Sequence, residues 1–136
     1  MRQQFPRQIT ALDEIFALLR HFGVEHGLDT AAQLELGVIV EELFTNQVRH
    51  ARGGGSHIEI ALGVDGDMIR LEISDENVEP FDPGSAPEVD ISRPAEERTP
   101  GGLGIHFVRQ MCDSFTWDYD PDRRLSRITI TRQLER

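Results

Sequence analysis

Apolar residues follow a helical spacing in the first part of the chain. After Thr10 they recur at intervals of three and four residues, at Leu12, Ile15, Phe16, Leu19 and Phe22. This spacing predicts a helix from Thr10 to about His26, with Asp13 as the acid of a capping box. Gly27 is expected to end it, because glycine accepts the left-handed conformation found after many helices.

The same spacing returns in a second, longer helix. Asp29 or Thr30 is predicted to cap its start, Gln33 completes a Thr-x-x-Gln box, and the helix is expected to run to about Ala51 and end at Gly53–Gly55. Its apolar residues are expected to supply the core-facing surface: Leu36, Val38, Ile39, Val40, Leu43, Phe44 and Val48.

Strand patterns follow the second helix. A hairpin is predicted with Asp65-Gly66 as its turn, because apolar residues alternate on both sides, at Ile58, Ile60, Leu62 and Val64 and then at Ile69, Leu71 and Ile73. Near the C-terminus a second hairpin is predicted around Asp120-Pro121-Asp122, from alternation at Phe115, Trp117 and Tyr119 and then at Leu125, Ile128 and Ile130. Residues 1–5 fit a short edge strand.

Between the hairpins, residues 75–99 are rich in proline, glycine and acid and have no periodicity. A segment this long in a small domain is usually functional or a linker, and we interpret 76–101 as a lid. Gly101, Gly102 and Gly104 then lead into a third helix from Ile105 to about Asp113. The order of elements predicts an α+β fold in one domain, 1–136: a two-layer sandwich with a mixed, mostly antiparallel sheet covered on one face by about three helices.

Composition narrows the function. The chain of 136 residues has a formal charge of −10, which argues against nucleic-acid binding and fits either a basic partner or simple solubility. It contains no lysine, which excludes a P-loop. Neither a signal peptide nor a membrane-spanning stretch is evident, and a single cysteine fits a reducing, cytoplasmic setting.

Three polar residues lie on one line of the second helix. Glu42, Asn46 and His50 are spaced i, i+4 and i+8, so they share a face. A solvated polar stripe is the ordinary interpretation of such a line. Magnesium prefers oxygen ligands and takes few of them from the protein, so the amide of Asn46 could hold it. A carboxylate one turn earlier could act as general base; Glu41 is the neighbouring candidate but lies about 100° round the helix.

Two further places could bind a nucleotide. Asp75 ends a strand, where a carboxylate could accept hydrogen bonds from the amino group of adenine, although taken alone an aspartate there more often starts a turn. The glycines of PGGLGIHF enter a helix whose N-terminus favours phosphate. A Rossmann origin is disfavoured because these glycines follow a long loop and not a first strand.

Together these stretches resemble the ATPase superfamily of gyrase, Hsp90, histidine kinases and mismatch-repair proteins (the Bergerat fold), and within it the anti-sigma-factor serine/threonine kinases. Glu42-Leu-Phe-Thr-Asn46, continuing to His50-Ala51, matches the N-box of that family. Asp75 with Phe81-Asp82-Pro83 is similar to its first glycine box, and Gly102-Leu103-Gly104-Ile105 matches its second.

The resemblance implies roles for these residues. Glu42 would be the catalytic base, Asn46 would bind magnesium, and Asp75 would hold the adenine amine of ATP. Gly102 and Gly104, with Gly101, Leu103 and Ile105, would border the phosphates, and His50 would stand behind Asn46.

The chain departs from the family pattern at two positions. Asn77 stands where the first box usually has glycine, and Asn tolerates the left-handed conformation better than most residues. Pro100 stands where some relatives carry arginine, and Arg98 could substitute for it.

The family also implies partners: a STAS-like anti-anti-sigma protein that is phosphorylated on serine, a sigma factor that is sequestered, and a homodimer. Two other functions remain open. One is a non-catalytic module in which ATP only controls partner choice. The other is the catalytic half of a histidine kinase, which is disfavoured because no dimerisation helices with a phospho-acceptor histidine precede the domain.

Overall fold

A five-stranded sheet carries the fold, and each neighbouring pair of its strands is antiparallel. The computed structural model describes residues 1–80 and 102–134. The strand order is β1-β2-β3-β5-β4, and the strands are β1 (Arg2–Pro6), β2 (His57–Asp65), β3 (Met68–Asp75), β4 (Ser114–Asp120) and β5 (Leu125–Gln133). The predicted mixed character of the sheet is therefore wrong for the described strands.

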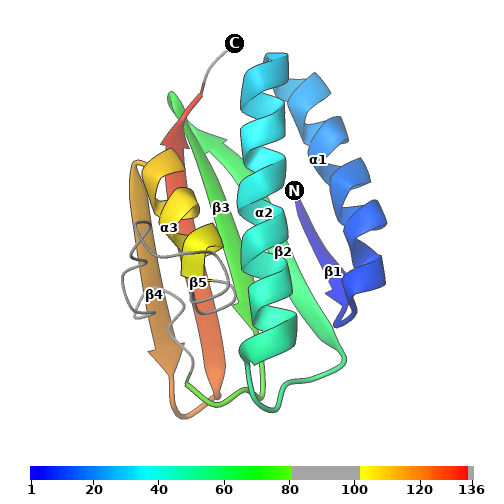
Figure 1. The fold of residues 1–136 in the computed structure, drawn as a ribbon, viewed down its shortest axis with the longest axis vertical. Coiled ribbons are helices and arrows are strands. Elements are labelled where there is room, and N and C mark those ends of the chain that lie inside the picture. Colours follow the sequence, from blue (N-terminus) through cyan, green and yellow to red (C-terminus); the bar gives the residue numbers. More distant parts are fainter. Residues whose placement is uncertain (81–101, 135–136) are drawn as a thin grey trace, which may run out of the picture.

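Three α-helices lie on one face of this sheet, which confirms the α+β two-layer prediction (Figure 1). They are α1 (Leu12–His26), preceded by a 3-10 turn η1 (Ile9–Ala11), α2 (Thr30–His50) and α3 (Gly102–Met111). In the view of Figure 1, α2 runs along the sheet with α1 on one side and α3 on the other. Within residues 1–80 and 102–134, no helix is both long and apolar enough to span a bilayer.

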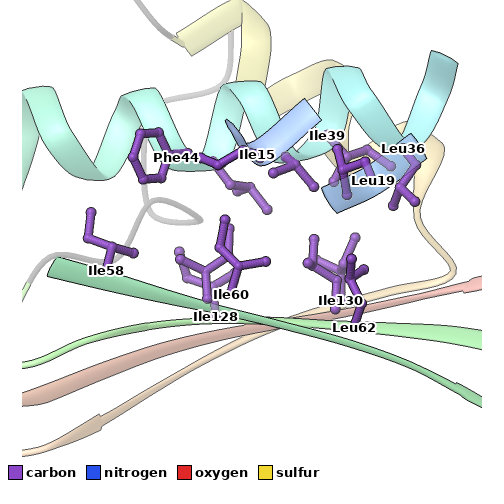
Figure 2. Packing of buried hydrophobic residues seen from close by; sticks show 14 of the residues in the cluster. Ile15, Leu19, Leu36, Ile39, Phe44, Ile58, Ile60, Leu62, Ile128 and Ile130 are labelled. Atoms are coloured by element: carbon purple, nitrogen blue, oxygen red, sulfur yellow. The ribbon is translucent and has the colours of Figure 1, made fainter. Parts of the chain in front are cut away.

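The core fills the layer between helices and sheet. Figure 2 shows the helical side chains Ile15, Leu19, Leu36, Ile39 and Phe44 above the sheet side chains Ile58, Ile60, Leu62, Ile128 and Ile130. All of these are at most 3% exposed, so the helical and strand periodicities identified the core correctly. Val38 is the exception: it is 44% exposed, because it lies on the side of α2 turned away from the sheet.

The ends of the elements differ in detail from the prediction. Thr10 lies in the 3-10 turn, and the cap of α1 is Ala11, with no side-chain hydrogen bond, so the capping box with Asp13 is wrong. Gly27 does end α1, with φ of 68°. Asp29 caps α2 and accepts a bond of 2.7 Å from the amide of Ala32.

The other two differences are small shifts along the chain. The first hairpin turns at Gly66-Asp67, one residue later than predicted, because Asp65 still pairs with Met68. Helix α3 begins at Gly102, so Gly102 and Gly104 form its first turn and do not precede it.

Candidate nucleotide site

Glu42 of α2 and Gly104 of α3 lie in direct contact where the two helices pack. A Cβ placed on Gly104 would stand 2.5 Å from Cδ and 3.2 Å from Oε1 of Glu42, so only glycine leaves room for this carboxylate. Glu42 is half-buried, as expected for a side chain directed at a neighbouring helix. Two of the predicted motifs, distant in sequence, are thus brought together at one point.

Asn46 lies one helical turn beyond Glu42 on the same side of α2 and is also half-buried. His50 is the last residue of α2 and is exposed. Glu41, the alternative carboxylate, is exposed, so Glu42 is the one directed toward α3. The polar line on α2 is therefore not a uniformly solvated stripe: its burial increases from His50 back to Asn46 and Glu42.

Asp75 ends β3 on the face of the sheet that the helices cover, and it is 1% exposed. Both of its oxygens are engaged. Oδ1 accepts a hydrogen bond from Nη2 of Arg7 in an ion pair, and Oδ2 accepts one of 2.7 Å from Nε2 of Gln47. A buried carboxylate requires such partners, because removing its charge from water without compensation is costly. Because Gln47 follows Asn46 directly, α2 connects Asp75 to the line of Glu42 and Asn46.

The chain after Asp75 is held by the glycine loop that follows α2. Asn77 has φ of 59°, which confirms that this asparagine adopts the left-handed conformation. Gly54 and Gly55 donate to the carbonyls of Asn77 and Glu76 over 2.7 and 3.1 Å.

Val78 and Glu79 are held in the same way. Val78 is fully buried and donates to the carbonyl of Arg124 over 3.1 Å, and Glu79 donates to that of Arg52 over 2.9 Å. The first residues of the predicted lid are therefore tied to the body of the domain.

The start of α3 provides the third part of the site. Gly102, Leu103 and Gly104 lie in its first turn, where backbone N–H groups have no partner within the helix. Ile105 is 4% exposed and anchors this turn in the core. An N-terminus of this kind favours an anion such as phosphate. Three predicted site residues, Phe81, Arg98 and Gly101, lie outside the described residues, as does most of the predicted lid.

Sequence reasoning missed two residues of this cluster, Arg7 and Gln47. Arg7 follows the edge strand β1, and no local pattern distinguishes it from the other arginines. Gln47 did carry a signal: it lies one residue beyond Asn46 and falls on the core-facing side of α2 with Leu43 and Phe44. A buried amide among apolar residues requires a polar partner, and that partner is Asp75.

A separate hollow of about 410 Å³ lies on the sheet face that the helices leave uncovered. Its lining includes Arg2 and Arg127, which alternate with the core residues of their strands, and Arg123 from the turn between β4 and β5. Arg2 pairs with Glu59, and Arg123 lies 3.6 Å from Glu76, so two of these cations are already neutralised. The hollow fits a solvated sheet face better than an anion site, and it is not the place where the predicted motifs meet.

The donor groups fit magnesium bound together with phosphate. The described residues contain no group of three or more His, Cys, Asp and Glu side chains that could hold a metal unaided. Asn46 and Glu42 offer oxygen donors one turn apart on α2, next to the phosphate-compatible start of α3. Magnesium takes one or two protein ligands and completes its shell with water and phosphate oxygens, so this sparse set is suitable.

The fold is a two-layer domain in which these motifs meet between α2, α3 and the end of β3, the candidate nucleotide site. The family model of the histidine kinase-like ATPase domain matches residues 5–131, which is nearly the whole chain. The chain therefore belongs to the histidine kinase-like ATPase family, and ATP is the nucleotide that this membership implies.

Among solved structures, the chain is similar to the histidine kinase AdeS of Acinetobacter baumannii. The TM-score is 0.50 at 16% identity, and the match covers 100% of this chain and 68% of that one. At this identity the likeness concerns the fold alone. No curated protein matches the chain.

Proposed function

We propose that this domain is an ATP-dependent serine/threonine protein kinase of the anti-sigma-factor type. Its substrate would be a serine of a small STAS-like antagonist protein, and it would sequester a sigma factor. The observation that carries the proposal is the contact of Glu42 with Gly104, because it places the only motif carboxylate of α2 at the phosphate-compatible start of α3.

Glu42 is proposed as the general base. A carboxylate next to the phosphate end of the site can accept the proton of a serine hydroxyl as that oxygen attacks the terminal phosphoryl group. The half-buried position keeps the carboxylate in contact with the helix start while leaving one side open to a substrate hydroxyl. Its contact with Gly104 would keep it close to the phosphates, as such a transfer requires.

Asn46 is the residue proposed to hold magnesium through its amide oxygen. When bound, the metal would neutralise charge on the phosphate oxygens. The backbone N–H groups from Gly102 to Gly104 would bind the phosphates at the start of α3, and the hydroxyl-bearing substrate would approach from the side of Glu42. His50, at the end of α2, would stay behind Asn46.

Asp75 is proposed to accept a hydrogen bond from the amino group of adenine. Each carboxylate oxygen has two acceptor positions, so the bonds from Arg7 and Gln47 leave capacity for a ligand donor. Phe81, Arg98 and Gly101 would complete the enclosure of the nucleotide from the predicted lid.

The proposed partners follow from the same family branch. We propose a homodimer in a reducing, cytoplasmic setting, in which one surface binds the antagonist protein and the sigma factor in turn. The strongly acidic charge of −10 would favour a partner with a basic surface. Direct binding to nucleic acid is not part of the proposal, since such an acidic protein lacks the basic footprint that phosphate contacts need.

A matched pair of glutamates on α2 tests the proposal. The protein is incubated with MgATP and a candidate STAS-like protein, and phosphoserine is detected by mass spectrometry. We expect Glu42→Gln to reduce transfer by about 10² to 10⁴-fold, the usual contribution of a general base. ATP affinity, measured by calorimetry, should change little, because the amide keeps the size and shape of the carboxylate.

Glu41→Gln is the control. This substitution removes the same charge from the same helix, but Glu41 is exposed. It should transfer phosphate at the wild-type rate. If both variants retain transfer, the base assignment is wrong. If nucleotide binds and no substrate is ever phosphorylated, the domain is a non-catalytic module in which ATP controls association.

A further inference from the structure

Arg7 is built into the structure in a way that an ordinary surface arginine is not. Its side chain is only 14% exposed, and Nε donates to the carbonyl of Gly55 over 3.1 Å. Its guanidinium lies against Gly54, where a Cβ would overlap it. Its backbone amide donates to the carbonyl of Ser56 over 2.9 Å. The guanidinium is therefore fixed before any ligand arrives, and the atom it is directed to is Oδ1 of Asp75.

The glycine run after α2 explains how Arg7 is accommodated. Gly53 and Gly54 have φ of 82° and 99°, a region that other residues rarely adopt. A Cβ on Gly53 would also lie 2.9 Å from the carbonyl oxygen of Asn77. The loop thus approaches both the backbone after Asp75 and the side chain of Arg7. These glycines not only end a helix; because they have no Cβ, they also leave room for the side chain of Arg7 to reach Asp75.

Two buried polar atoms beside Asp75 have no partner within the described part of the chain. They are Nη1 of Arg7, a donor, and Oε1 of Gln47, an acceptor, and their residues bond to different oxygens of the same carboxylate. Buried groups without partners are uncommon, because each loses its bonds to water. A ligand with both donor and acceptor atoms, such as the edge of a purine ring, would satisfy such a pair.

We propose that Arg7 and Gln47 are positioning residues that hold the carboxylate of Asp75 in one orientation, so that it discriminates purine bases by their 6-amino group. This inference rests on the proposed role of Asp75 in ATP binding and extends it to base selection. Arg7 neutralises the buried charge on one oxygen, and Gln47 fixes the other, so the carboxylate cannot rotate away from an incoming amine. Preorganisation of this kind raises selectivity because the site bears no cost of reorientation on binding.

The test compares two nucleotides on each protein by calorimetry. One is MgATP, and the other is the magnesium complex of purine riboside triphosphate, which has hydrogen in place of the 6-amino group. We expect wild-type protein to prefer ATP. In Arg7→Met the ATP affinity should fall about tenfold or more, because a bond to a charged group is lost, while affinity for the analogue changes less than about twofold. Gln47→Leu should act in the same direction.

Two further variants separate positioning from mere stability. Arg7→Lys keeps the positive charge and should retain part of the selectivity for ATP. It can be measured even if Arg7→Met folds poorly. Arg2→Met is the matched control, because Arg2 lies on the same edge of the sheet in an exposed pair with Glu59; its selectivity should equal that of the wild type.

The outcomes are distinguishable. Equal loss of affinity for both nucleotides in Arg7→Met would show that Arg7 only stabilises the fold, and a gain in ATP affinity would show that Arg7 blocks the site; either result overturns the inference and leaves the proposed function standing. Wild-type protein that binds neither nucleotide would instead overturn the proposed function, and the inference with it.

Discussion

Both ends of the layer between α2 and the sheet contain a buried ion pair, but the buried partner differs. At the site end the carboxylate of Asp75 is 1% exposed, and Arg7 reaches it from a position that is 14% exposed. At the opposite end the side chain of Arg132 on β5 is 7% exposed, and it pairs over 2.6 Å with Glu35, which is 46% exposed.

We interpret the difference as one between the proposed binding end and a structural end. A buried carboxylate keeps acceptor positions that a ligand donor can use. A buried guanidinium that is neutralised by a solvent-facing glutamate needs only partners for its own N–H donors. At this end Leu36, which follows Glu35 on α2, is fully buried, and Cys112, which feels the charge of Arg132, is half-buried. We therefore expect changes at the site end to alter binding and transfer, and changes at the opposite end to alter stability.

Leu36→Ala should give the largest effect on stability. Leu36 is fully buried under α2, so its truncation leaves a cavity and should reduce the free energy of unfolding by about 2–5 kcal/mol. Denaturant titration measures this loss, and calorimetry at a temperature where the variant is folded should give the wild-type ATP affinity. A change in affinity larger than about threefold in folded protein would mean that the two ends are coupled.

Cys112 should be about 100-fold less reactive in the native protein than in the unfolded chain. Burial raises the pKa of its thiol from 9.0 to about 11, opposed by the nearby charge of Arg132. The raised pKa favours the neutral thiol, so this contribution to stability is present below pH 9 and is lost as the pH rises toward 11. Alkylation by iodoacetamide at pH 8, with and without denaturant, measures the ratio; equal rates would contradict the assignment of this end as a closed one.

Gly104→Ala should lower phosphate transfer about tenfold without lowering stability. The new methyl group would displace the carboxylate of Glu42, which is the flexible end of a side chain, and misplacement of a catalytic group is costly. Alanine also favours a helix over glycine, by about 0.5–1 kcal/mol. Gly37→Ala on α2 is the control, because a Cβ there meets no atom within 4 Å; it should show the gain in stability with unchanged transfer.

Glu35→Gln should give the smallest effect, a loss of about 1 kcal/mol in the free energy of unfolding. The glutamate is nearly half exposed, so its own solvation is little changed, but Arg132 loses its charged partner. Thermal unfolding measures the loss. Nucleotide affinity should stay at the wild-type value, and a decrease would place Arg132 within the binding end.

Much of the fold was readable from local pattern. The helical spacing at Ile15 and Leu19 and the strand alternation at Ile58 and Ile60 predicted buried faces that the structure confirms. Periodicity failed at Val38, because the consecutive apolar residues Val38, Ile39 and Val40 lie on different sides of the helix and the sequence does not show which of them will lie outside. The capping box at Thr10 failed because a 3-10 turn precedes α1 and displaces its start.

In the candidate site, too, local pattern predicted some features and the packing of the elements decided others. The sequence alone determined its motifs, namely the polar line of Glu42 and Asn46, the carboxylate of Asp75 and the glycines before Ile105, because residue type and local spacing suffice to define them. Only the tertiary structure decided that Glu42 touches Gly104 and that Arg7 and Gln47 hold Asp75. Those contacts join residues far apart in the chain, and their distances depend on how helices and strands pack, which no local pattern records.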